Sequence, residues 1–169
     1  MPRSRTSRSA QPNPGNGRAA ALRLLASRRL TEAQLWDRLV ARAYPEDVVR
    51  DAVAFCKGQG YLDDRLFARL YVDGKRKAVG DARLVAELVK RGIEREAARA
   101  TVARAASSED ERLLAALEKL FRTRANLEYP NAARALERLG FPASSIYRHL
   151  RARAAADFAT FEDSTAERA

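Results

Sequence analysis

The chain has 169 residues, a formal net charge of +10 and 46% hydrophobic residues. Enough apolar side chains are present to form a core, which excludes a wholly disordered protein. The chain has one cysteine and one histidine, which excludes an intrachain disulfide and a zinc site built from several Cys and His ligands. No apolar stretch is long enough to span a bilayer, so we expect a reducing, cytoplasmic location and no membrane contact.

The two ends of the chain differ from its middle in composition. Residues 1–17 contain arginine, proline and glycine but no acid and no apolar segment of a secretory signal, so we expect a flexible basic arm. Residues 157–169 are acidic, and we expect a disordered tail there. The charges of the two ends cancel, so the positive charge belongs to the middle of the chain. It predicts attraction to polyanions or to acidic protein surfaces.

The first group of predicted helices covers residues 18–58. Its three helices are expected over residues 18–28, 32–43 and 45–57. Thr31 and Gln34 have the spacing of a capping box at the start of the second helix. Pro45 suits the first turn of the third, where a missing backbone N–H costs nothing.

The second group covers residues 59–106. Its helices are expected over residues 63–78, 82–91 and 94–106. Asp63 and Asp64 are adjacent carboxylates that can hold a metal or share a proton, but they stand where a helix begins, and capping explains them more simply. Asp81 is expected to cap the second helix, and Gly92 to end it in a left-handed turn.

The third group covers residues 107–156. Its helices are expected over residues 109–124, 130–139 and 142–155. Pro130, Gly140 and Pro142 mark the boundaries between them.

The three groups form an internal repeat. Leu39 and Leu88 are 49 residues apart, and Leu88 and Leu136 are 48 apart. The same offsets relate Ala43 to Gly92 and then to Gly140. A unit of three helices buries its apolar faces poorly by itself, and stacking on a neighbour hides them. The sequence therefore predicts an all-α fold of three tandem three-helix repeats that form a curved, elongated, solenoid-like molecule.

Residues with catalytic potential are few. The sequence has neither a phosphate-binding Gly-rich loop ending in Lys and Ser or Thr nor a Gly-x-Ser-x-Gly elbow. His149 has no partner nucleophile in the local sequence, and a packing or surface role is the simpler interpretation. Cys56 lies on the apolar side of its helix and is expected to be a small buried hydrophobe. We therefore expect no enzyme, no cofactor and no metal.

Basic residues cluster in the second and third groups. Singly, each is explained equally well as a solvated cation near a helix end, but together they favour contact with phosphates or an acidic surface. The candidate contacts are Lys75, Arg76, Lys77, Arg83, Lys90, Arg91, Arg134, Arg138, Arg148 and Arg151. Aromatic residues do not alternate with these cations as a stacking surface for single strands requires, and Tyr61, Phe67 and Tyr71 are expected in the core.

The sequence resembles the RecX family of recombination regulators. The resemblance covers roughly residues 18–152 and is densest over 60–93. Its motifs are Ala21-Leu22-Arg23-Leu24-Leu25-Ala26, Gly60-Tyr61-Leu62-Asp63-Asp64, Phe67-Ala68, Tyr71-Val72, Gly80-Asp81-Ala82-Arg83-Leu84, Glu87-Leu88 and Lys90-Arg91-Gly92-Ile93. The chain departs from the family pattern at Asp81, where proline is usual, and at Ala43, where glycine is often found.

The resemblance implies three tandem three-helix repeats and a role in homologous recombination and DNA repair. It also implies binding to RecA on single-stranded DNA, with inhibition of filament extension, of the ATPase and of strand exchange, and it implies no cofactor. We expect a monomer that contacts DNA through its basic surface. Two alternatives remain open: a DNA-binding protein that affects RecA only by competing for DNA, and a helical-repeat adaptor for an unrelated partner.

Overall fold

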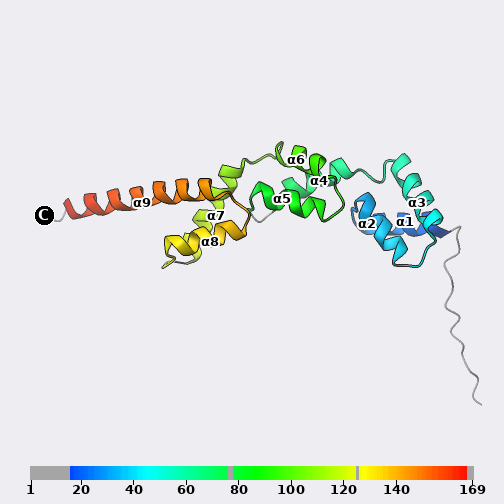
Figure 1. Ribbon diagram of the computed structural model, residues 1–169, viewed down its shortest axis with the longest axis horizontal. Coiled ribbons are helices and arrows are strands. Elements are labelled where there is room, and N and C mark those ends of the chain that lie inside the picture. The colour runs from blue at the N-terminus through cyan, green and yellow to red at the C-terminus, as the bar shows by residue number, and fades with distance from the viewer. Residues whose placement is uncertain (1–15, 76–77, 125, 167–169) are drawn as a thin grey trace, which may run out of the picture. The chain divides into compact units, whose positions relative to one another are not determined.

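The computed structural model describes residues 16–75, 78–124 and 126–166, which fold into helices without any strand (Figure 1). The helices are α1 (Gly17–Ser27), α2 (Glu32–Val40), α3 (Glu46–Gly58), α4 (Asp64–Asp73), α5 (Asp81–Val89), α6 (Arg95–Val102), α7 (Glu109–Thr123), α8 (Tyr129–Arg138) and α9 (Ala143–Ala166). The predicted all-α repeat fold is confirmed. The chain divides into two compact units. Unit 1 holds the described residues up to Ala68 together with Arg91–Ile93, and unit 2 holds Arg69–Lys90 with the described residues from Glu94 onward.

Unit 1 is built on the packing of α1, α2 and α3. Each helix has an apolar face, and the side chains that meet at the centre include the fully buried Leu35, Leu39 and Val49. Cys56 is also fully buried, as expected of a small hydrophobe. At the surface, Arg18 pairs with Asp51 at 2.8 Å and ties the start of α1 to α3.

The start of α2 contacts a turn from much later in the chain, also within unit 1. Thr31 and Gln34 form the predicted capping box. The Thr31 hydroxyl, which is fully buried, also donates a hydrogen bond of 2.5 Å to the carbonyl of Arg91. The N–H of Glu32 donates to Oδ1 of Asp64 at 2.9 Å. Caps of this kind satisfy helix N–H groups that have no partner within the helix.

Unit 2 contains an equivalent arrangement at the start of α5. The N–H of Gly80 donates to the carbonyl of Leu139 at 3.0 Å. The N–H of Asp81 donates to Oε1 of Glu109 at 2.7 Å. Gly80 lies so close to the turn after α8 that a Cβ atom at this position would stand 2.0 Å from the carbonyl oxygen of Gly140. Nearby, a core of α7, α8 and α9 surrounds buried leucine and isoleucine side chains.

The two arrangements repeat the same contacts. In both, the first residues of a group's second helix lie against the turn that follows the second helix of the next group. A backbone N–H at that helix start also donates to a carboxylate at the start of the next group's first helix. Gly92 and Gly140, which occupy equivalent turns, both have φ +87°, as the sequence predicts for a left-handed helix end. The third member of this set, Ala43, is also left-handed, with φ 59°. The internal repeat thus includes the contacts that join consecutive groups. The expected curved outline of the whole molecule stays a prediction.

Three expectations about helix ends are wrong. Asp81 does not cap α5, because Gly80 occupies the N-cap position and the Asp81 side chain instead pairs with Arg112. α4 ends at Asp73 and not at residue 78, because the chain turns there, with the N–H of Lys75 bonded to the carbonyl of Val72 at 3.2 Å. α9 continues to Ala166, where a disordered tail was expected from residue 157.

Two side chains near the middle of α9, Arg153 and Asp157, hold this helix against α7 and α8 where the unexpected extension begins. Asp157 accepts a hydrogen bond of 2.7 Å from the Tyr129 hydroxyl. The Arg153 guanidinium lies over the Phe121 ring, 4.4 Å from its centroid. These contacts with α7 and α8, and the alanines that precede Asp157, favour helix beyond residue 156. A further expectation is wrong for Tyr61, which was placed in the core but is 57% exposed.

Candidate functional site

A partly buried carboxylate on α5 binds three other side chains of unit 2. Glu87 Oε2 accepts hydrogen bonds from the Tyr71 hydroxyl at 2.5 Å and from the Lys75 ammonium, and its Oε1 lies 3.2 Å from Nε of Arg83. Lys75 also donates to the Tyr71 oxygen at 2.9 Å. We refer to Glu87, Tyr71, Lys75 and Arg83 as the Glu87 cluster. Only 22% of the Glu87 side chain and 23% of the Lys75 side chain are exposed.

The surroundings of Glu87 favour its charged form. Partial burial by itself would raise the pKa of Glu87, but hydrogen bonds from Lys75, Tyr71 and Arg83 outweigh burial and lower the pKa from 4.5 to about 2. Burial opposes the charged form of Lys75 as well, yet its bonds to Glu87 and Tyr71 leave the pKa of Lys75 raised. Glu87 and Lys75 therefore stay charged at neutral pH, and the negative charge of Glu87 offsets part of the positive charge around it.

The Glu87 cluster joins two predicted contact residues, Lys75 and Arg83, and Arg83 also contacts a third, Arg138. Arg83 Nη1 donates to the backbone carbonyl of Arg138 at 2.8 Å, which places the start of α5 beside the end of α8. The side chain of Arg138 is exposed, as is that of Arg134 one turn earlier on α8. Lys75 and Arg83 thus help to hold unit 2 together, while Arg134 and Arg138 are presented to solvent.

The other predicted contact residues lie in different places. Lys90 is exposed in unit 2, and Arg91 is partly exposed in unit 1, where its carbonyl accepts from Thr31. Arg76 and Lys77 lie outside the residues that the structure describes.

The α9 candidates lie on an exposed part of unit 2. Arg148 Nη2 bonds to both carboxylate oxygens of Asp110, at 2.6 and 2.8 Å, whereas Arg151 is exposed. The neighbouring His149 is largely buried, with Nε2 3.4 Å from Asp110 Oδ1. This position agrees with the packing role expected for the histidine.

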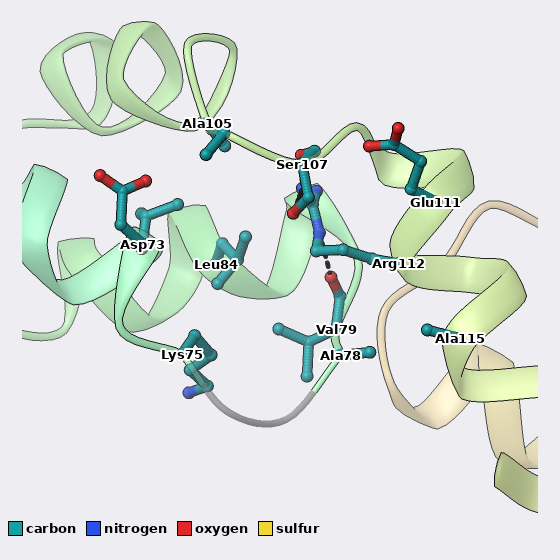
Figure 2. Close-up of a pocket in the computed structure, with 12 residues that line it drawn as sticks. Asp73, Lys75, Ala78, Val79, Leu84, Ala105, Ser107, Glu111, Arg112 and Ala115 are labelled. Atoms are coloured by element: carbon teal, nitrogen blue, oxygen red, sulfur yellow. Dashed lines mark hydrogen bonds between the residues drawn. The ribbon is translucent and has the colours of Figure 1, made fainter.

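A pocket of about 430 Å³ opens within unit 2, between the end of α4, the segment before α5, the segment before α7 and α7 itself (Figure 2). Arg112 lies on its wall and donates from Nε to the Val79 carbonyl at 3.1 Å, the bond drawn as a dashed line. The same guanidinium bonds to the Ser107 carbonyl and pairs with Asp81.

Three of the four charged side chains that line the pocket make contacts that stabilise the fold. Arg112 joins three segments, Lys75 belongs to the Glu87 cluster, and Glu111 bonds to the N–H of Ser108 at the start of α7. Val72, Val79 and Leu84 supply much of the remaining surface. The lining contains neither histidine nor cysteine, so it holds no pairing of a nucleophile with an imidazole base.

Neither a cluster of metal ligands nor a membrane-spanning helix occurs in the part of the chain that the structure describes. Within it, no three His, Cys, Asp or Glu side chains gather as metal ligands. None of its helices combines the length and the apolar character needed to cross a membrane.

These features define an all-α helical-repeat protein with exposed cations on α8 and α9. Comparison with known proteins identifies its family. The sequence profile described as RecX, first three-helix domain, matches residues 18–56. A regulatory protein RecX of Thermus thermophilus is 36% identical over 124 residues, which cover 73% of this chain and 82% of that protein. The chain belongs to the RecX family of regulatory proteins.

Other relatives agree with this assignment over different lengths. The regulatory protein RecX of Caldanaerobacter subterraneus is 36% identical over 77 residues, which cover 45% of this chain but only 39% of that protein. Among solved structures, RecX from Lactobacillus salivarius has the same fold, with a TM-score of 0.69 at 21% identity over 82% of this chain and 96% of that chain. The Thermus and Caldanaerobacter relatives bear the name of a regulatory protein, and the match to this chain spans less than half of the Caldanaerobacter protein.

The sequence predicts Lys75 and Arg83 as contact residues but does not reveal that both bind the carboxylate of Glu87. A signal was present, because Tyr71 and Lys75 are four residues apart, and so are Arg83 and Glu87. Residues at this spacing share one face of a helix. That both pairs meet at one carboxylate depends on the packing of the segment after α4 against α5.

Proposed function

We propose that this protein regulates homologous recombination and DNA repair by binding the RecA–single-stranded-DNA filament. In this proposal it is a cytoplasmic monomer without enzymatic activity that inhibits filament extension, the RecA ATPase and strand exchange. The observation that carries the proposal is the 36% identity to a protein named regulatory protein RecX over 82% of that protein's length. The net charge of +10 supports contact with a polyanionic filament.

The exposed arginines are the best candidates for this contact. Arg134 and Arg138 on α8 and Arg151 on α9 extend into solvent. Lys75 and Arg83 are held by Glu87, so we assign them a smaller part in binding. Lys90 and Arg148 of unit 2 and Arg91 of unit 1 are further proposed contact residues, as are Arg76 and Lys77, which lie outside the described residues.

The test is the single-strand-dependent ATPase of RecA, measured while the protein is added at fixed moderate salt. Inhibition well below one copy per RecA supports action on the filament. A variant with Arg134→Gln and Arg138→Gln should inhibit more weakly. A matched variant with Arg23→Gln and Arg28→Gln, two exposed arginines of unit 1, should inhibit normally although it loses the same charge. Full inhibition by the Arg134 and Arg138 variant would refute the assignment of this surface.

A second function, competition for DNA, is favoured by the positive charge alone. A basic protein of this kind would bind bare DNA in a salt-dependent way and would inhibit RecA only when it covers the DNA. Added free DNA would then relieve inhibition in proportion. Inhibition that persists in excess free DNA would exclude this alternative.

A further inference from the structure

One face of α9 carries two exposed aromatic rings. Tyr147 is 48% exposed and Phe158 is 73% exposed, although large aromatic side chains usually bury most of their surface. Arg151 is exposed between them. The three residues are separated by four and seven positions, which places them within a narrow arc of the helix. Ile146 and Leu150, which face the core of unit 2, lie on another side of α9.

The stripe carries one positive charge, that of Arg151. Arg151 forms no ion pair within the described part of the chain, whereas Arg148, next to Tyr147, is paired with Asp110. Asp157, next to Phe158, already accepts from the Tyr129 hydroxyl and lies 3.8 Å from Arg153. Acidic residues resume in the sequence one turn beyond Phe158, at Glu162. The exposed positive charge on this side of α9 is therefore that of Arg151, which lies between Tyr147 and Phe158.

Aromatic rings spaced around an unpaired arginine suit a single-stranded nucleic acid better than an apolar partner. Every base has a flat face that can stack on an aromatic ring, and the phosphate between two bases requires a cation. The two rings are about 16 Å apart along the helix axis, with the arginine between them. An apolar protein segment would instead leave Arg151 buried without a partner, which is costly.

We propose that Tyr147, Arg151 and Phe158 form a stacking surface for single-stranded nucleic acid, in which the rings stack on two bases of the strand and Arg151 binds a phosphate of the backbone that runs between those bases. This inference rests on the nucleic-acid contact in the proposed function and names residues that make it. It replaces the expectation that aromatic residues do not alternate with the basic ones. That expectation covered the basic residues of the second and third groups, and α9 of the third group supplies both exposed rings.

The experiment compares two labelled oligonucleotides of equal length and charge, oligo(dT) and an abasic strand, by fluorescence anisotropy with the full chain. Tyr147→Ala and Phe158→Ala should each bind oligo(dT) at least about fivefold more weakly and bind the abasic strand like the wild type. Tyr147→Phe, which keeps the ring, should retain binding. Arg151→Gln should weaken binding to both strands and reduce the salt slope by about one. Tyr61→Ala, which removes an exposed ring outside α9, is the control and should bind both strands normally.

Other results would overturn the stacking surface. Wild-type protein that binds both strands equally, with no effect of the alanine variants, would leave the nucleic-acid contact intact but exclude stacking. Wild-type protein that binds neither strand would exclude both the surface and direct contact with DNA, while inhibition of RecA is tested separately. If sedimentation shows that the wild type self-associates and that Phe158→Ala dissociates it, the face binds a second copy of the chain instead. Circular dichroism confirms that each variant is folded.

Discussion

Replacing Glu87 by glutamine tests whether the Glu87 cluster stabilises unit 2. The substitution preserves the size of the side chain but removes the charge that three donors share. Lys75, of which only 23% is exposed, would then keep its positive charge with only neutral partners. Leaving a partly buried charge without its counter-ion is strongly unfavourable.

The size of the effect follows from the pKa of Glu87. A carboxyl group whose pKa falls from 4.5 to about 2 on folding stabilises the folded state by about 3 kcal/mol when it is ionised in both states. Because the pKa is lower in the folded protein, this contribution is complete above pH 4.5 and is lost as the pH falls from 4.5 towards 2. We therefore expect Glu87→Gln to lose about 3 kcal/mol of unfolding free energy at pH 7. At pH 3 the difference from the wild type should be less than half as large.

The assay is urea unfolding followed by circular dichroism at the two pH values. Glu96→Gln is the matched control, because Glu96 pairs with Arg99 at 2.6 Å on the exposed surface of α6. Such a surface pair contributes at most about 1 kcal/mol, so this variant should unfold almost like the wild type. A Glu87→Gln variant as stable as the wild type at pH 7 would refute the reasoning. A loss of equal size at both pH values would also refute it, because the lost contacts would then not be electrostatic.

Three further predictions use the same unfolding measurement, and a fourth uses thiol labelling. Ala43→Gly should stabilise the protein by about 1 kcal/mol, because Ala43 has φ 59°, a conformation that costs residues with a Cβ atom; no gain would argue against the equivalence of the three turns. Gly80→Ala should destabilise by more than about 2 kcal/mol, since its Cβ would overlap a backbone carbonyl, whereas Gly58→Ala, with open space around it, should not destabilise. Thr31→Val should cost about 2 kcal/mol, because the buried hydroxyl both caps α2 and donates to a distant carbonyl; an unchanged urea midpoint would show that neither bond matters. Cys56 should react with thiol reagents only on unfolding, since burial both shields the thiol and raises its pKa, and rapid labelling of the folded protein would contradict its buried position.

Much of the local structure follows from the sequence alone. The periodic leucines, the capping box at Thr31 and the glycine at 92 are local signals, because each acts on residues within one or two turns. The 49-residue repeat is visible for the same reason, since equivalent turns need equivalent residues. The all-α repeat fold and the family resemblance therefore follow from the pattern of residues itself.

The tertiary structure decided which charges are available. The sequence predicts Lys75, Arg83, Arg134 and Arg138 all as contact residues, but only packing brings the first two onto Glu87 and leaves the other two in solvent. Asp81 resembled a cap by position, yet Arg112 from α7 takes its carboxylate. The exposure of Tyr147 and Phe158 likewise depends on which side of α9 the neighbouring helices cover. Helical periodicity determines which residues share a face. Contacts between residues far apart in the chain determine which face is buried, and which cations are paired within the fold and which stay exposed to a binding partner.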